Sequence, residues 1–222
     1  MQLRELDSPR EPARQGANSR RWLAFVRVAV NLAGAASAAF FARASLLFYL
    51  QTHRLIGVAF FLEQAWFVTA FLIRRPAKSV AGPGLPWLLA AGGTFGGLLL
   101  RPTGLHPAWG VSTGLALQLA GLVLAVTSLV ILGRSFGFVA ADRGLVTRGP
   151  YAVIRHPLYA AYIVIQSGYL LQSISVRNVL VLGFATCCNI GRIYAEERLL
   201  ARSADYAEYA GRVRWRLVPG LW

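Results

Sequence analysis

The chain has 222 residues, of which 56% are hydrophobic and only 14% are charged. Soluble domains usually carry about 25% charged residues, so the composition excludes an ordinary soluble domain and predicts an integral membrane protein. The formal net charge is +14, but the basic residues gather at the ends of apolar runs, a pattern typical of membrane topology signals rather than of nucleic-acid binding.

The first part of the chain predicts a tail followed by four membrane helices. Residues 1–21 are polar and mixed in charge, and we expect a disordered tail there rather than a signal peptide. Residues 22–132 hold four apolar runs, each close to the roughly 20 residues that cross a bilayer. We predict transmembrane helices at 22–42, 55–73, 85–100 and 111–132.

The third predicted helix contains a glycine-rich run at residues 92–97. The run does not have the G-x-G-x-x-G spacing of a nucleotide-binding loop, and no strand precedes it. Small residues let membrane helices approach closely, so we interpret the run as a packing surface.

Residues 133–222 form a distinct C-terminal region. A polar loop at 133–155 precedes apolar runs at 158–171 and 176–193, and a basic, aromatic segment at 196–222 predicts one or two surface helices. The run at 158–171 is short for a full crossing. The sequence therefore predicts an all-α, polytopic helical membrane protein with five or six transmembrane helices.

Arginine and lysine placement predicts the topology. With the N-terminus in the cytoplasm, 18 basic residues lie on the cytoplasmic side and four on the opposite side. Both termini are then cytoplasmic. The high arginine, alanine and glycine content favours a high-GC bacterium, so we expect the bacterial inner membrane.

Two polar clusters flank the last apolar runs: RGPYAVIRHPLY at 148–159 and RIYAEE at 192–197. Proline suits the first helical turn, so a helix is expected to begin at Pro157. The residues before it would lie at a helix N-terminus, which favours anions, and Arg155 adds charge there. His156 is either part of this binding site or a satisfied structural histidine.

The second cluster holds Arg192, Glu196 and Glu197. On a helix, Arg192 and Glu196 share a face and can form an ion pair, and the simplest interpretation of such a pair is a surface contact. Two adjacent carboxylates at the end of an apolar run favour a further role, in which one accepts hydrogen bonds from a ligand ammonium or ribose. Dense polar groups at a membrane edge usually bind something. We therefore expect one cytoplasmic-face pocket for a small charged cofactor.

These motifs resemble the C-terminal region of the isoprenylcysteine carboxyl methyltransferase family, which is similar in turn to phospholipid methyltransferases. The family pattern reads G-P-Y, R-H-P-x-Y, R-x-x-x-E-E-x-x-L, Y-x-x-Y and a late proline. Its counterparts here are Gly149-Pro150-Tyr151, Arg155-His156-Pro157-Leu158-Tyr159, Arg192 with Glu196, Glu197 and Leu200, Tyr206 with Tyr209, and Pro219. Ala161 replaces a frequent glycine, and no proline follows Asn189.

The resemblance implies S-adenosylmethionine as cofactor and catalytic roles for Arg192 and Glu196, with Arg192 facing the acceptor. The residues that it implies at the cofactor are Leu145, Val146, Gly149, Tyr151, Arg155, His156, Tyr159, Glu196, Glu197, Tyr206 and Tyr209. The expected activity is methyl transfer to a membrane-embedded or amphipathic acceptor, which would be a carboxylate, an amine, a thiol or a phenol. A membrane reductase using NADPH and a non-enzymatic scaffold are the alternatives.

An intramembrane acid is a functional-site hypothesis by default. Glu63, beside Gln64 in the second span, and Asn189 are predicted to line the path of a lipid or amphipathic substrate. Packing of Glu63 against Arg27 or Arg43 is the structural alternative. The histidines lie in separate segments, and Cys187 and Cys188 are expected to be packing residues, so the sequence predicts no metal site.

Overall fold

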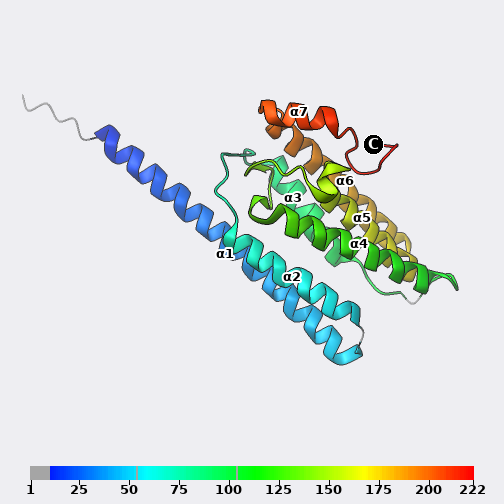
Figure 1. Cartoon of the computed structure of the whole chain (residues 1–222). Helices are drawn as coiled ribbons and strands as arrows, with labels where there is room; N and C mark the ends of the chain where they lie inside the picture. The colour runs from blue at the N-terminus through cyan, green and yellow to red at the C-terminus, as the bar shows by residue number, and fades with distance from the viewer. Residues whose placement is uncertain (1–10, 54, 104) are drawn as a thin grey trace, which may run out of the picture.

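The computed structural model describes residues 11–53, 55–103 and 105–222, and most of these residues are helical (Figure 1). The expected all-α class is confirmed. The elements in chain order are α1 (Glu11–Thr52), α2 (Leu55–Ile73), β1 (Ser79–Val80), α3 (Leu85–Phe95), η1 (Gly96–Leu99), α4 (Gly110–Leu132), η2 (Gly133–Ser135), β2 (Ala141–Asp142), η3 (Gly149–Ala152), α5 (Pro157–Gln172), α6 (Val176–Leu200) and α7 (Ala204–Arg212).

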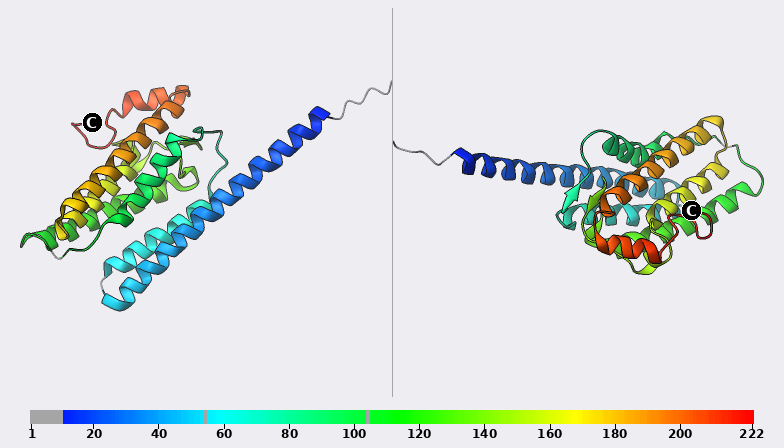
Figure 2. Two further views of the ribbon diagram at one scale, coloured as in Figure 1. Left: turned by 180° about the vertical axis from the view of Figure 1, so that it is seen from behind. Right: turned by 90° about the horizontal axis from the view of Figure 1, so that it is seen from above.

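Helices α1 and α2 form an antiparallel hairpin that lies beside the bundle of α3 to α6 (Figure 2). Close approach at two small residues fixes the register: Gly34 faces the Phe71 ring, and Gly57 faces the Ser45 carbonyl. Phe71 and Leu129 belong to one buried hydrophobic cluster. This cluster joins the hairpin to α4.

Close helix packing also explains the glycine-rich run of α3. A Cβ atom at Gly92 would lie 2.6 Å from the Cys188 sulfur, and one at Gly93 would overlap the Asn189 side chain. A Cβ atom at Gly96 would lie 3.2 Å from the Ala185 methyl group. The run is therefore the surface on which α6 packs, as interpreted from the sequence.

The helix boundaries agree with the sequence at several points and differ at others: α1 continues past the predicted end at residue 42 to Thr52, and α3 ends at Phe95 rather than at residue 100. Helix α2 spans the predicted residues, and α5 begins at Pro157 as expected. Residues 11–21, expected as tail, continue α1, whereas residues 1–10 lie outside the described residues. Helix α6 extends to Leu200, so Arg192, Glu196 and Glu197 lie on one continuous helix.

Three described helical segments are long and apolar enough to cross a membrane: Val28–Thr52, Gly110–Ser135 and Val176–Leu200. Phe60–Ile73 and Leu85–Phe95 are shorter apolar helices. Large apolar side chains on these helices are exposed, as expected for surfaces that face lipid. Membrane integration is thus supported, and the count of five or six spans stays a prediction.

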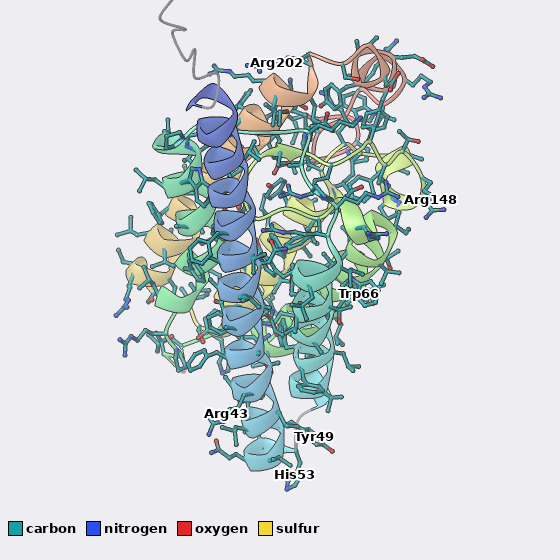
Figure 3. All side chains as sticks on the ribbon, turned by 90° about the vertical axis from the view of Figure 1, so that its left-hand side faces the viewer. Arg43, Tyr49, His53, Trp66, Arg148 and Arg202 are labelled. Atoms are coloured by element: carbon teal, nitrogen blue, oxygen red, sulfur yellow. The ribbon has the colours of Figure 1, made fainter. Side chains whose placement is uncertain are left out.

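The two ends of the molecule carry different groups (Figure 3). Arg148 and Arg202 lie at one end, and Arg43, Tyr49 and His53 lie at the other. The loops around β1 and β2 are joined by an antiparallel pair, with Ser79 opposite Asp142. Which end faces the cytoplasm stays a prediction from the arginine distribution.

Candidate functional site

The C-terminal tail holds the segment that precedes α5. The Arg155 amide donates to the Trp215 carbonyl, and the His156 amide donates to the Arg216 carbonyl, both at 2.9 Å. Helix α5 follows at once, because Pro157 at its first position needs no hydrogen-bond acceptor for its backbone nitrogen. The tail therefore fixes the backbone from which His156 extends.

Glu196 joins the two polar clusters. The Tyr159 hydroxyl donates a hydrogen bond to Glu196 Oε1, and His156 Nδ1 lies 3.8 Å from Glu196 Oε2. His156 and Tyr159 are buried, whereas the Glu196 side chain is 22% exposed. A carboxylate, a phenol and an imidazole thus meet where α5 and α6 approach each other, and the expectation that the clusters come together is confirmed.

Glu197 makes a different set of contacts from its neighbour. Its Oε1 lies 3.2 Å from His156 Nε2 and 3.4 Å from Arg155 Nη1, and Arg216 Nε donates to its Oε2 at 2.9 Å. Two guanidinium groups and an imidazole therefore surround this carboxylate. The imidazole bridges Glu196 and Glu197, so Glu197 orients His156 from the side away from the tyrosine.

Arg192 extends from α6 toward α3. Its Nη1 donates to Thr94 Oγ1 at 3.2 Å, its Nη2 donates to the Phe138 carbonyl at 2.9 Å, and the guanidinium lies 5.0 Å from the centre of the Tyr159 ring. The expected Arg192–Glu196 ion pair is wrong, because these contacts turn the guanidinium away from the carboxylate.

Buried tyrosines close the site on the α7 side. The Tyr209 hydroxyl donates to the Tyr151 carbonyl at 2.7 Å, and the Tyr206 and Tyr209 rings meet edge to face. Burial raises the pKa of Tyr209 to about 12 and raises the pKa values of Tyr151 and Tyr206 above the usual phenol value. The three phenols therefore remain neutral hydrogen-bond donors at neutral pH.

A cavity of about 880 Å³ extends from these groups into the space between the hairpin and the bundle. Ligand sites typically have volumes of about 300–1,000 Å³, so the space is sufficient for a cofactor and part of an acceptor. Most predicted site residues line it: Glu63, Leu145, Val146, Tyr151, Arg155, His156, Tyr159, Arg192, Glu196, Tyr206 and Tyr209.

Three predicted residues do not line this cavity. Glu197 is occupied by the contacts described above. Gly149 has a φ of 61°, which favours glycine, and a side chain there would meet Ile131. Asn189 is buried under Gly93, and its Oδ1 accepts a hydrogen bond from Arg192 at 3.5 Å. These contacts show what each residue does in the folded protein, and the predicted roles of the three residues at a ligand stay predictions.

Several groups that hold the predicted residues in place could not be found from the sequence. Thr94, the Phe138 carbonyl and Arg216 contact Arg192 or Glu197, but no local spacing links them to the two motifs. For Arg216 a weak signal exists, because an arginine flanked by aromatic and apolar residues near the end of the chain is compatible with burial. Its partner could not be read from the sequence.

The part of the chain that contains this site is similar to a known protein family. Residues 109–206 match the family model described as phospholipid methyltransferase. This range includes the two polar clusters and the helices that bring them together. The resemblance expected from the motifs is therefore confirmed for this part of the chain.

Two curated relatives extend the comparison. The chain is 32% identical over 126 residues to protein-S-isoprenylcysteine O-methyltransferase B of Arabidopsis thaliana, covering 50% of this chain and 60% of the relative. It is 36% identical over 106 residues to cobalt-zinc-cadmium resistance protein CzcN of Cupriavidus metallidurans, covering 44% of this chain and 46% of the relative. The chain thus spans about half the length of the curated relatives it matches.

The name of the second relative makes the metal-binding side chains relevant. Among the residues that the structure describes, no group of three or more histidine, cysteine, aspartate or glutamate side chains is placed to hold a metal ion.

Proposed function

We propose that this protein is a membrane methyltransferase that uses S-adenosylmethionine to methylate a membrane-embedded or amphipathic acceptor. The observation that carries the proposal is the meeting of Glu196, His156 and Tyr159 at the wall of a large cavity. The match of residues 109–206 to the phospholipid methyltransferase family supports the same reaction.

The groups that line the cavity fit the polar parts of the proposed cofactor. Glu196 keeps an exposed edge that suits an ammonium or ribose hydroxyl, and Arg155 suits a carboxylate. The faces of Tyr159 and Tyr206 suit a sulfonium cation, which aromatic rings attract. Leu145 lines the cavity beside them and offers apolar contact to a nucleobase.

The proposed mechanism depends on position and charge. S-adenosylmethionine, when bound, supplies an electrophilic methyl group on a sulfonium. Arg192, which lies against the Tyr159 ring at the cavity wall, would orient the acceptor and stabilise a nucleophile that carries negative charge. For an acceptor that must lose a proton, Glu196 and His156 are the cavity-lining groups that would receive it.

The proposed location follows from the arginine distribution. With both termini in the cytoplasm, the Glu196 end of the cavity faces the compartment in which soluble cofactors are present. The acceptor would enter from the bilayer, beside the apolar helices. We propose the bacterial inner membrane as the site of action.

A labelled-methyl assay tests the reaction. Purified protein in lipid nanodiscs, incubated with radiolabelled S-adenosylmethionine and a bacterial lipid extract, should transfer label to an extractable lipid. His156→Ala should abolish this transfer while the protein still inserts into membranes. Transfer at the wild-type rate by that variant would contradict the proposed site.

The alternative as an NADPH-dependent reductase predicts a different ligand response. S-adenosylhomocysteine should raise the thermal unfolding midpoint of the wild-type protein, and NADPH at the same concentration should not. The reverse result would favour the reductase. A midpoint unchanged by either ligand would favour a non-enzymatic scaffold.

A further inference from the structure

The cavity continues from the Glu196 end toward the middle of the helices, where a second set of polar side chains lines its wall. Glu63 and Gln64 of α2, Gln118 of α4, and Tyr162 and Gln166 of α5 all line it. We call these five residues the mid-span belt. Three helices supply them, so the belt is a property of the cavity rather than of one helix face.

Glu63 is the most unusual member of the belt. Its side chain is 4% exposed, and no hydrogen bond or ion pair to it is found among the described residues. Arg43 is exposed, and no hydrogen bond or ion pair joins it to Glu63 in the described part of the chain, so an ion pair with Arg43 does not account for Glu63. Along the α1–α2 hairpin, Glu63 lies between two close contacts of the helices, Gly34 with Phe71 and Gly57 with Ser45.

The register also separates Glu63 from Arg27, the other structural alternative. Arg27 precedes Gly34 in α1, so its backbone lies beyond the Gly34–Phe71 contact, whereas Glu63 lies between that contact and the Gly57–Ser45 contact. The Arg27 side chain is not among those that the structure describes. A buried carboxyl group that lines a cavity without a protein partner points to a ligand group as its partner.

The belt lies deeper in the membrane region than the proposed reaction centre. Tyr162 and Gln166 follow Tyr159 along α5 by about one and two helical turns, or roughly 5 and 10 Å. Trp66, one turn from Glu63 on α2, lies between the two ends of the molecule in Figure 3. An acceptor whose reacting group reaches Glu196 would therefore extend past the belt.

A purely hydrocarbon tail is poorly suited to this path. A hydrocarbon chain that displaces water from a buried polar group leaves that group without a hydrogen bond. The free-energy cost of the unsatisfied group is larger than the net stabilisation by a typical hydrogen bond. Gln118 has a protein partner, since Gln172 Nε2 donates to its Oε1 at 3.2 Å. Glu63 has no hydrogen bond or ion pair among the described residues, and it is the carboxyl group of the belt, so an apolar tail costs most beside it.

We propose that the acceptor carries, in addition to its methyl-accepting group, a hydroxyl group on its otherwise apolar chain, and that Glu63 accepts a hydrogen bond from it. This inference rests on the proposed function, because it describes the acceptor of the same site. It excludes a plain prenyl or acyl chain as the preferred tail. Glu63 is accordingly a specificity-determining residue rather than a catalytic one.

Matched amphiphiles test the inference by binding rather than by turnover. The probes are dodecanoate and 7-hydroxydodecanoate, and dodecylamine and 7-hydroxydodecylamine, which place a hydroxyl at the depth of the belt. Dissociation constants are measured for protein in nanodiscs with and without S-adenosylhomocysteine. The hydroxylated member of at least one pair should bind about fivefold more tightly than its plain counterpart, as expected for one net hydrogen bond.

Variants at Glu63 test whether the preference for the hydroxylated tail depends on the Glu63 side chain. Glu63→Leu should remove the preference for the hydroxyl, whereas Glu63→Gln, which keeps a hydrogen-bond acceptor, should retain part of it. Leu62→Ala, at a position 60% exposed on the outer face of the same helix, is the matched control and should keep the wild-type preference.

Equal or tighter binding of the plain tails by the wild type would overturn the inference, as would a hydroxyl preference that persists in Glu63→Leu. If Glu63→Leu does not fold, the Glu63→Gln and wild-type measurements still decide. Failure of S-adenosylhomocysteine to bind would instead contradict the proposed function. The tail preference measured without that ligand would remain informative in that case.

Discussion

The C-terminal region and the α1–α2 hairpin contribute to the same cavity by different means. Polar contacts between distant segments fix the C-terminal region, with Glu197 alone engaging three side chains. The hairpin instead packs through small residues and aromatic rings, as Gly34 and Phe71 illustrate. One region therefore fixes the orientation of the reacting groups, whereas the other mainly shapes the space for an acceptor.

Replacing Arg192 should have the largest effect after that of His156→Ala. Arg192→Ala removes the charge beside Tyr159 and is expected to lower methyl transfer by about 100- to 1000-fold, as loss of a positioned charged donor does in other enzymes. Transfer is measured with the labelled donor in nanodiscs, and Arg192→Lys serves as the conservative control. Near-normal transfer by the alanine variant would show that the C-terminal region does not hold the reaction centre.

Glu197→Gln should act through orientation and stability. The substitution removes the negative charge that Arg155, Arg216 and His156 surround, and is expected to destabilise the folded protein by about 1–3 kcal/mol. Thermal unfolding in nanodiscs measures this change. Arg216→Ala should give a loss of similar size, because it removes one partner of the same carboxylate, and unchanged midpoints in both variants would contradict the described network.

Gly34→Ala tests the hairpin. The added methyl group meets the Phe71 ring, and overpacking of this kind costs about 1–3 kcal/mol, at the lower end where the ring can shift. We expect a lower unfolding midpoint and an altered KM for the acceptor, with unchanged affinity for S-adenosylhomocysteine. A large loss of affinity for S-adenosylhomocysteine would contradict the claim that the hairpin mainly shapes the space for the acceptor.

The smallest effect is expected on the surface of α7. Arg212 and Glu208 are 3.8 Å apart, and both side chains are more than half exposed. Glu208→Ala should change stability by no more than about 0.5 kcal/mol, because solvent screens such pairs. Both thermal unfolding and methyl transfer should be close to wild type, and a strong loss would point to an unrecognised role for α7.

The elements with local signals were predictable from the sequence. Apolar runs predicted α2 and α4 nearly to the residue, and the proline at 157 marked the start of α5. The motifs around His156 and Glu196 predicted that two segments meet, because polar side chains so dense at a membrane edge are costly to desolvate unless they bind something. The continuation of α1 through residues 11–21 was not predicted, because their polar composition resembles a tail.

The partners within the site could not be predicted for a physical reason. Spacing along one helix suggested that Arg192 pairs with Glu196, but acceptors on α3 and at Phe138 compete for the guanidinium. Equally, nothing local distinguishes Glu196 from Glu197, although one lines the cavity and the other is surrounded by cations. Such distinctions arise only when distant segments pack together.

The decisive experiment for the proposed cofactor pocket compares the binding of S-adenosylhomocysteine to the wild-type protein and to Glu196→Gln by calorimetry in nanodiscs. We expect one bound ligand per chain in the wild type and at least about tenfold weaker binding in the variant, as expected for loss of a charge-assisted hydrogen bond. No detectable binding by the wild type, or equal affinity in the two proteins, would contradict the pocket.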